Sequence, residues 1–153
     1  MWARLRRFSA LPRSAKVVFV QATLLLPVIA LSLRLRGFTR TRRSLQSLLA
    51  ASSGAIAISR PATSTDALMV SRMVLAAALH SLFDATCLER SLVLWWLLAR
   101  RGISSQLRIG VRKSGEKFEA HAWVERDGIA IAEPEASHRH YAPFAKEFTG
   151  ELS

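Results

Sequence analysis

The spacing of apolar residues changes along the chain. Residues 17–33 form an almost unbroken apolar run, and apolar positions recur every three or four residues over 66–82 and 88–100. After residue 105 the period becomes two, over 106–111, 118–125 and 129–133, with turn residues between these segments. The pattern predicts helices followed by three short antiparallel strands, which is an α+β fold.

The helix over 88–100 has signals at both of its ends. Residues 86–89, Thr-Cys-Leu-Glu, have the form of a capping box, and two arginines at 100–101 precede Gly102, a typical C-terminal stop. If the threonine is the cap, Cys87 is the first helical residue, at the positive end of the helix dipole, where reactive cysteines occur. The alternative is an inert, packed thiol, because free cysteine is commonly buried.

The apolar run over 17–33 has three interpretations: a signal peptide, a membrane span or a buried helix. No cleavage site is clear, and the run is shorter than the about 20 apolar residues of a span and has basic clusters on both sides. The pattern therefore favours a buried helix, kinked or broken at Pro27, next to a second helix near 39–51.

The chain divides by composition into a basic helical region over 1–50, a connector over 51–65 rich in small and polar residues, and a domain over 66–153. Half of the residues are hydrophobic, which excludes global disorder. The single cysteine excludes a disulfide framework and zinc sites built from cysteine pairs.

The positive charge lies in the first part of the chain. The formal net charge is +11, and residues 1–65 hold eleven basic side chains and no acidic one. Such a segment suits nucleic acid, an anionic lipid surface or an acidic partner. Because no zinc pattern, RNA-binding signature or Gly-rich phosphate loop accompanies the charge, we expect no nucleic-acid partner, whereas peripheral membrane contact stays open.

A metal site has weak support in the sequence. His138 and His140, with Glu133 and Glu135, do not have the spacing of a recognised ligand set. We therefore expect no metal and no other cofactor.

His121 is the candidate base for Cys87, and its geometry depends on one turn. A two-residue turn at 127–128 would put His121 and Glu133 on opposite faces of the sheet. A three-residue loop over 126–128, with a bulged glycine, would place Glu133 directly opposite, with Cβ atoms about 5 Å apart. Our hypothesis is the second arrangement, in which the carboxylate orients the imidazole as in a nucleophile–base–acid triad. Otherwise Glu133 is a solvated acid at a strand end.

The C-terminal part resembles the transglutaminase-like superfamily and, within it, the stand-alone leader peptidases of lasso-peptide biosynthesis. The matching segments are CLERSL at 87–92, LLARRGI at 97–103, LRIGV at 107–111 and HAWVE at 121–125. Residues 21–38 also resemble the helical lead-in of that family.

The resemblance implies a cysteine-protease core in which a cysteine at a helix N-terminus packs on an antiparallel sheet that carries a histidine and an acid. Cys87, His121 and Glu133 would be the catalytic residues. The family's acid is usually aspartate, so Asp127 is an alternative to Glu133.

The resemblance further implies a cytoplasmic peptidase that removes the leader from a lasso-peptide precursor before macrolactam closure. Its partners would be the ribosomal precursor peptide, a small leader-binding protein and an asparagine-synthetase-like cyclase. Two alternatives stay open: an acyl transferase of the same fold, and a non-catalytic scaffold that binds a partner or a membrane.

Overall fold

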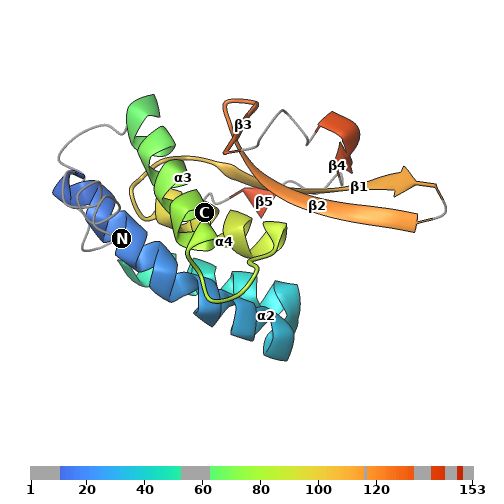
Figure 1. The fold of residues 1–153 in the computed structure, drawn as a ribbon, viewed down its shortest axis with the longest axis horizontal. Coiled ribbons are helices and arrows are strands. Elements are labelled where there is room, and N and C mark those ends of the chain that lie inside the picture. Colours follow the sequence, from blue (N-terminus) through green and yellow to red (C-terminus); the bar gives the residue numbers. More distant parts are fainter. Residues whose placement is uncertain (1–10, 53–62, 116, 133–138, 144–147, 150–153) are drawn as a thin grey trace.

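Helices make up the first part of the chain and strands the last (Figure 1). The computed structural model describes residues 11–52, 63–115, 117–132, 139–143 and 148–149. The elements are α2 (Arg13–Ser52), α3 (Ser64–Leu79), α4 (Cys87–Ala99), β1 (Gln106–Ser114), β2 (Lys117–Arg126), β3 (Ile129–Ile131), β4 (Ala142–Pro143) and β5 (Phe148–Thr149). The predicted α+β class is confirmed. Most of the predicted connector, residues 53–62, lies outside the described residues.

Helix α2 has one break, and it is not where the sequence predicted it. The helix continues through Pro27, whereas Gly37 has φ 74° and ψ 173°, a backbone conformation open mainly to glycine. Across this break the hydroxyls of Ser32 and Thr41 lie 2.8 Å apart. The expected break at Pro27 is therefore wrong. Pro27 is exposed, so water can solvate the carbonyl that lacks its helical partner.

The three helices share one hydrophobic core, with α4 at its centre. Every residue from Ser91 to Leu98 is buried, because α4 contacts α2 and α3 as well as β1 and β2 (Figure 1). The indole Nε1 of Trp96 donates to the Leu45 carbonyl of α2 at 3.2 Å. A helix that is apolar on all sides belongs in such a position.

The predicted C-terminal stop of α4 is confirmed. Gly102 has φ 67°, its N–H bonds the Ala99 carbonyl, and the N–H of Ile103 bonds the Leu98 carbonyl, as in a Schellman motif. Arg101 donates to the Leu97 carbonyl and to Gln21 of α2, each at 3.0 Å. Burial, together with neighbouring Arg100, lowers the pKa of Arg101.

The sheet is antiparallel, with the order β3-β2-β1-β4 and β5 also paired with β1. In the β2–β3 hairpin Val124 pairs with Ile131 and Arg126 with Ile129, so the turn has two residues. Both of these residues, Asp127 and Gly128, have positive φ (51° and 74°), as a type I′ turn requires.

The hypothesis of a three-residue loop with a bulged glycine is therefore wrong. A type I′ turn matches the twist of the flanking strands, and an Asp-Gly pair supplies it without an extra residue. Strand β3 ends at Ile131, and Ala132 follows with φ 63°. Glu133 lies outside the described residues.

Candidate active site

Cys87 is the first residue of α4, as the sequence predicted. Both arms of the capping box are present: the Thr86 hydroxyl accepts from the Glu89 N–H at 3.3 Å, and the Glu89 carboxylate accepts from the Thr86 N–H at 2.8 Å. Glu89 is buried, which fixes this turn against the protein. The N–H groups of Cys87 and Leu88 have no acceptor among the described residues, as at a typical helix start.

Cys87 and His121 line the same pocket. It has a volume of about 80 Å³ and lies between α3, the start of α4 and the β2–β3 hairpin. Cys87 is half-buried, whereas an inert, packed thiol would be buried. The rest of the wall is mostly apolar, with Ser71, Arg90 and Ser91 as further polar members. The predicted nucleophile and the predicted base therefore both contribute to the wall of one pocket.

A buried hydrogen bond joins the helix of Cys87 to the strand of His121. Ser91, one turn further along α4, donates its hydroxyl to the carbonyl of Ala122 at 2.9 Å. Ser91 is only 7% exposed. Because Ala122 is the residue after His121, this bond holds the first turns of α4 against the part of β2 that carries His121.

Two aromatic rings border the imidazole of His121. The ring of Trp123 is stacked on it, with centroids 6.0 Å apart and an angle of 17° between the planes. The ring of Tyr141, just before β4, lies at 5.1 Å and 35°. These neighbours restrict rotation of the imidazole.

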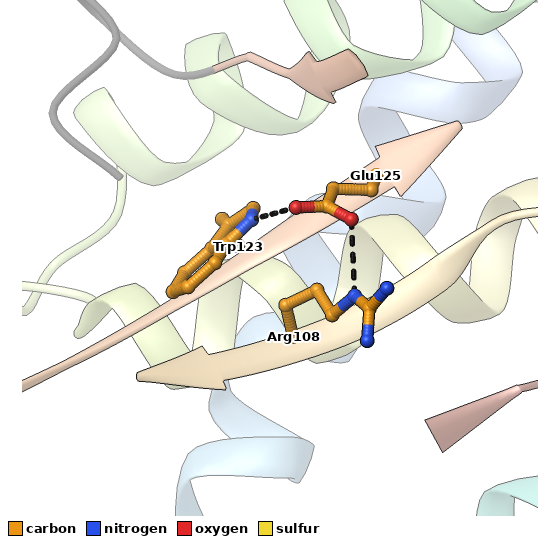
Figure 2. Close-up of polar contacts among 3 residues, drawn as sticks. All are labelled: Arg108, Trp123 and Glu125. Atoms are coloured by element: carbon orange, nitrogen blue, oxygen red, sulfur yellow. Dashed lines mark hydrogen bonds and ion pairs between the residues drawn. The ribbon is translucent and has the colours of Figure 1, made fainter. Parts of the chain in front are cut away.

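Trp123 is in turn held by a carboxylate. Its indole Nε1 donates to Oε1 of Glu125 at 2.8 Å, and Oε2 of the same carboxylate pairs with Nε of Arg108 at 3.0 Å (Figure 2). Arg108 is the partner of Trp123 in the β1–β2 register, so the three side chains share one face of the hairpin. The HAWVE segment thus places a histidine, the ring stacked on it and the acid that holds that ring.

Gly110 lies opposite His121 in the register and makes room for this arrangement. A Cβ atom there would lie 2.9 Å from Cη2 of Trp123 and 2.9 Å from the Ala142 carbonyl oxygen. Both contacts are too short for real atoms, so a side chain at this position would displace the indole or β4.

The sequence indicated His121 but not its supports. The period of two places Trp123 and Glu125 on its face, which was a usable signal, yet the role of Arg108 follows only from the strand register. Tyr141 gave no signal, because it lies far along the chain outside any periodic segment.

Of the two acids predicted as partners of His121, the structure describes only Asp127. Glu133, the predicted triad member, is outside the described residues. Asp127, the alternative, lies on the β2–β3 turn, pairs with Arg126 at 3.4 Å, and has a side chain that is 84% exposed. It does not line the pocket of Cys87 and His121. Six residues of strand, about 20 Å, separate it from His121 along β2.

The other described carboxylates on the His121 face are in ion pairs. Glu125 pairs with Arg108, and Glu119 pairs with Arg112 at 2.6 Å. The hydrogen bond to Glu119 raises the pKa of Arg112. The described residues contain no group of three or more His, Cys, Asp or Glu side chains that could hold a metal ion. Of the loose metal set, Glu133, Glu135 and His138 lie outside those residues.

The chain was compared with family models, curated proteins and solved structures. The model of one family, described as the transglutaminase-like superfamily, matches residues 26–146. Cys87, His121 and the residues that line their pocket all lie within the matched range. Searches of curated proteins and of solved structures found no significant match.

Proposed function

The chain belongs to the transglutaminase-like superfamily, and from this premise we propose that it is a cysteine peptidase that removes the leader from a lasso-peptide precursor. The superfamily includes both cysteine peptidases and acyltransferases. The observation that carries the proposal is the pocket lined by both Cys87 and His121. The narrower assignment rests on the segments CLERSL and HAWVE.

Cys87 is the nucleophile in this proposal. Its Sγ attacks the carbonyl carbon of the scissile peptide bond, and His121 takes the thiol proton and delivers it to the leaving amine. The backbone N–H of Cys87, at the start of α4, donates to the developing oxyanion. The two-residue turn rules out the directly opposed pairing of Glu133 with His121, but β3 ends at Ile131 and Ala132 has φ 63°, so the alternation of faces does not extend past Ala132. We propose that Glu133, the next residue, orients the imidazole.

Cleavage then proceeds through a thioester between Cys87 and the leader. Water attacks this thioester, which frees the sulfur and releases the leader with a new carboxylate. The remaining core peptide has a free N-terminal amine. Such an amine is what a macrolactam-forming cyclase needs as its substrate.

The proposal includes partners and a location. A small leader-binding protein presents the precursor peptide, and an asparagine-synthetase-like cyclase acts on the released core, all in the cytoplasm. Two polar residues of the pocket, Arg90 and Ser91, lie within the CLERSL segment, so this segment contributes to the pocket wall beyond Cys87 itself.

The test combines the purified chain with the leader-binding protein and the precursor in oxygen-18-labelled water. Mass spectrometry should find a leader with one heavy oxygen at its new carboxylate, together with the free core. Cys87→Ala should abolish the products, and His121→Ala should lower the initial rate by about a hundredfold or more. His80→Ala is the matched control, because His80 is exposed and does not line the pocket.

Two results would overturn the proposal. Full cleavage by Cys87→Ala would remove the nucleophile from the reaction. A product in which the leader carries an added amine, without labelled oxygen, would establish acyl transfer in place of hydrolysis.

A further inference from the structure

A stripe of aliphatic side chains lies exposed along α2 before its break at Gly37. Its members are between 49% and 75% exposed: Val17, Val20, Leu24, Val28, Leu31 and Leu35. Steps of three or four residues keep all six on one face of the helix. At 1.5 Å per residue the stripe is about 27 Å long. We call it the α2 stripe.

The opposite face of α2 is already used. Ala15, Val18, Ala22, Leu26 and Ile29 are buried there, and α2 contacts α3 and α4. The helix is therefore apolar on two sides, of which the described residues cover one. A helix of this kind is normally enclosed on every side by protein or lipid.

Polar groups beside the α2 stripe are satisfied within the protein. The Thr23 hydroxyl donates to the Phe19 carbonyl at 2.9 Å, and Gln21 accepts from Arg101 at 3.0 Å. The surface of the stripe is therefore apolar, and these polar side chains next to it do not depend on water for their hydrogen bonds. It is a convex helix face and not a groove.

Basic residues stand at both ends of the α2 stripe. Arg13 and Lys16 lie at its start and Arg34 at its end, and no acidic residue occurs anywhere between 13 and 52. On both sides of Gly37 a concave site of about 380 Å³ is lined by Arg36, Arg40, Arg43, Ser44 and Ser47. Three guanidinium groups and two hydroxyls in one hollow suit phosphate oxygens.

We propose that the α2 stripe and this arginine site dock on an anionic lipid surface, with the section of α2 before Gly37 lying in the plane of the membrane. Aliphatic side chains enter the acyl region, and the arginines pair with headgroup phosphates. The inference concerns a surface outside the proposed active site and is independent of the peptidase assignment.

Charge and shape favour lipid over the other occupants. A second copy docked through the same stripe would bring the basic ends of two helices together, with no acidic residue on α2 to offset the repulsion. A spanning orientation would require lipid on all sides of α2, but one side packs on α3 and α4. By length and composition alone α2 is long and apolar enough to cross a membrane, as the core helix of a soluble protein can also be.

Docking in this orientation leaves the active site accessible. No residue of α2 lines the pocket of Cys87 and His121. Helix α4 lies between α2 and the sheet, so the strand that carries His121 is on the far side from the proposed membrane contact (Figure 1).

The experiment is flotation of the full chain with vesicles of phosphatidylcholine alone or mixed with phosphatidylglycerol, at low and high salt. We expect binding to the anionic vesicles that weakens with salt. The double variant Leu24→Gln/Val28→Gln should reduce this binding by about tenfold or more. The triple variant Arg36→Gln/Arg40→Gln/Arg43→Gln should do the same for anionic vesicles only.

Phe118→Gln is the matched control, since Phe118 is an exposed apolar residue on β2, 76% exposed, and should leave binding unchanged. Unfolding curves should show that both α2 variants stay folded, because the substituted side chains are exposed. Cys87→Ala should bind as well as the parent chain, which keeps this result separate from catalysis.

Several outcomes would overturn the inference. One is equal binding to neutral and anionic vesicles, and another is no binding to either. A third is a dimer in light scattering that Leu24→Gln/Val28→Gln dissociates, which would assign the α2 stripe to a second copy. A fourth is binding of inorganic phosphate at the arginine site without any binding of vesicles, which would make it a site for free anions.

Discussion

Ser91 and Ala122 are joined by a buried hydrogen bond of 2.9 Å that links α4 to β2. The two residues lie one turn after Cys87 and one residue after His121. The bond therefore ties the elements that carry the two proposed catalytic groups to each other. We propose that it helps to position them and takes no part in the reaction itself.

Ser91→Ala should lower both stability and cleavage rate. Removing the hydroxyl leaves the Ala122 carbonyl buried without this donor, which costs about 1–3 kcal/mol of the free energy of unfolding. Ser105→Ala is the control, because the buried Ser105 hydroxyl has no partner among the described residues. That substitution should cost little. Equal losses in urea unfolding of the two variants would contradict the role given to Ser91.

Glu125→Ala should destabilise the chain and slow cleavage through Trp123. The substitution leaves the nearly buried indole N–H and Arg108 without the carboxylate, at a cost of about 1–3 kcal/mol. Glu125→Gln retains an acceptor for the indole and should rescue much of the rate. Steady-state kinetics of the two variants make this comparison.

Glu119→Ala is the matched control for Glu125→Ala. Its ion pair with Arg112 is far more exposed, with side chains 39% and 42% accessible, so its loss should cost less than about 1 kcal/mol. A larger loss of stability from Glu119→Ala than from Glu125→Ala would refute the proposed network.

Gly110→Ala should destabilise the hairpin, although alanine is a small residue. The added methyl would meet the Trp123 ring and the Ala142 carbonyl at 2.9 Å, and overpacking of this kind costs about 1–3 kcal/mol. Trp123→Phe removes the ring atoms of the first contact, so the double variant should be less destabilised than the sum of the two changes. Simple additivity in thermal unfolding would show that Gly110 does not make room for the indole.

Asp127→Asn and Glu133→Gln distinguish the two candidate acids. Asp127 has φ 51° in a type I′ turn, which asparagine also suits, and it does not line the pocket. Asp127→Asn should therefore leave the cleavage rate close to that of the parent chain. Glu133→Gln should lower it by about tenfold or more if Glu133 orients His121. The reverse pattern of rates would assign the acid to Asp127.

The sequence predicted local features of the fold well. The start and end of α4 follow from a capping box and a Gly stop, both of which act within a few residues. The length of the β2–β3 turn could not be predicted in this way, because an Asp-Gly pair fits both two- and three-residue loops. The break in α2 was misplaced because an exposed proline is tolerated, whereas the positive φ at Gly37 depends on how Thr41 packs back toward Ser32.

The positions of Cys87 at the start of α4 and of His121 on β2 were predictable, because each occurs at a distinctive point of a periodic segment. The contacts that join Arg108, Glu125 and Trp123 were not predictable, because they depend on the register between two strands. Periodicity also could not reveal the α2 stripe. An apolar run on all sides of a helix does not say which face the rest of the protein covers.

The most direct measurement of the central claim is the alkylation rate of Cys87 by iodoacetamide at neutral pH. Because the chain has one cysteine, the mass shift reports on this thiol alone. We expect the folded parent chain and His80→Ala to react alike. His121→Ala should react at about one tenth of the parent rate or below, because in the proposed mechanism His121 takes the thiol proton. Equal rates for the parent chain and His121→Ala would contradict a functional Cys87–His121 pair.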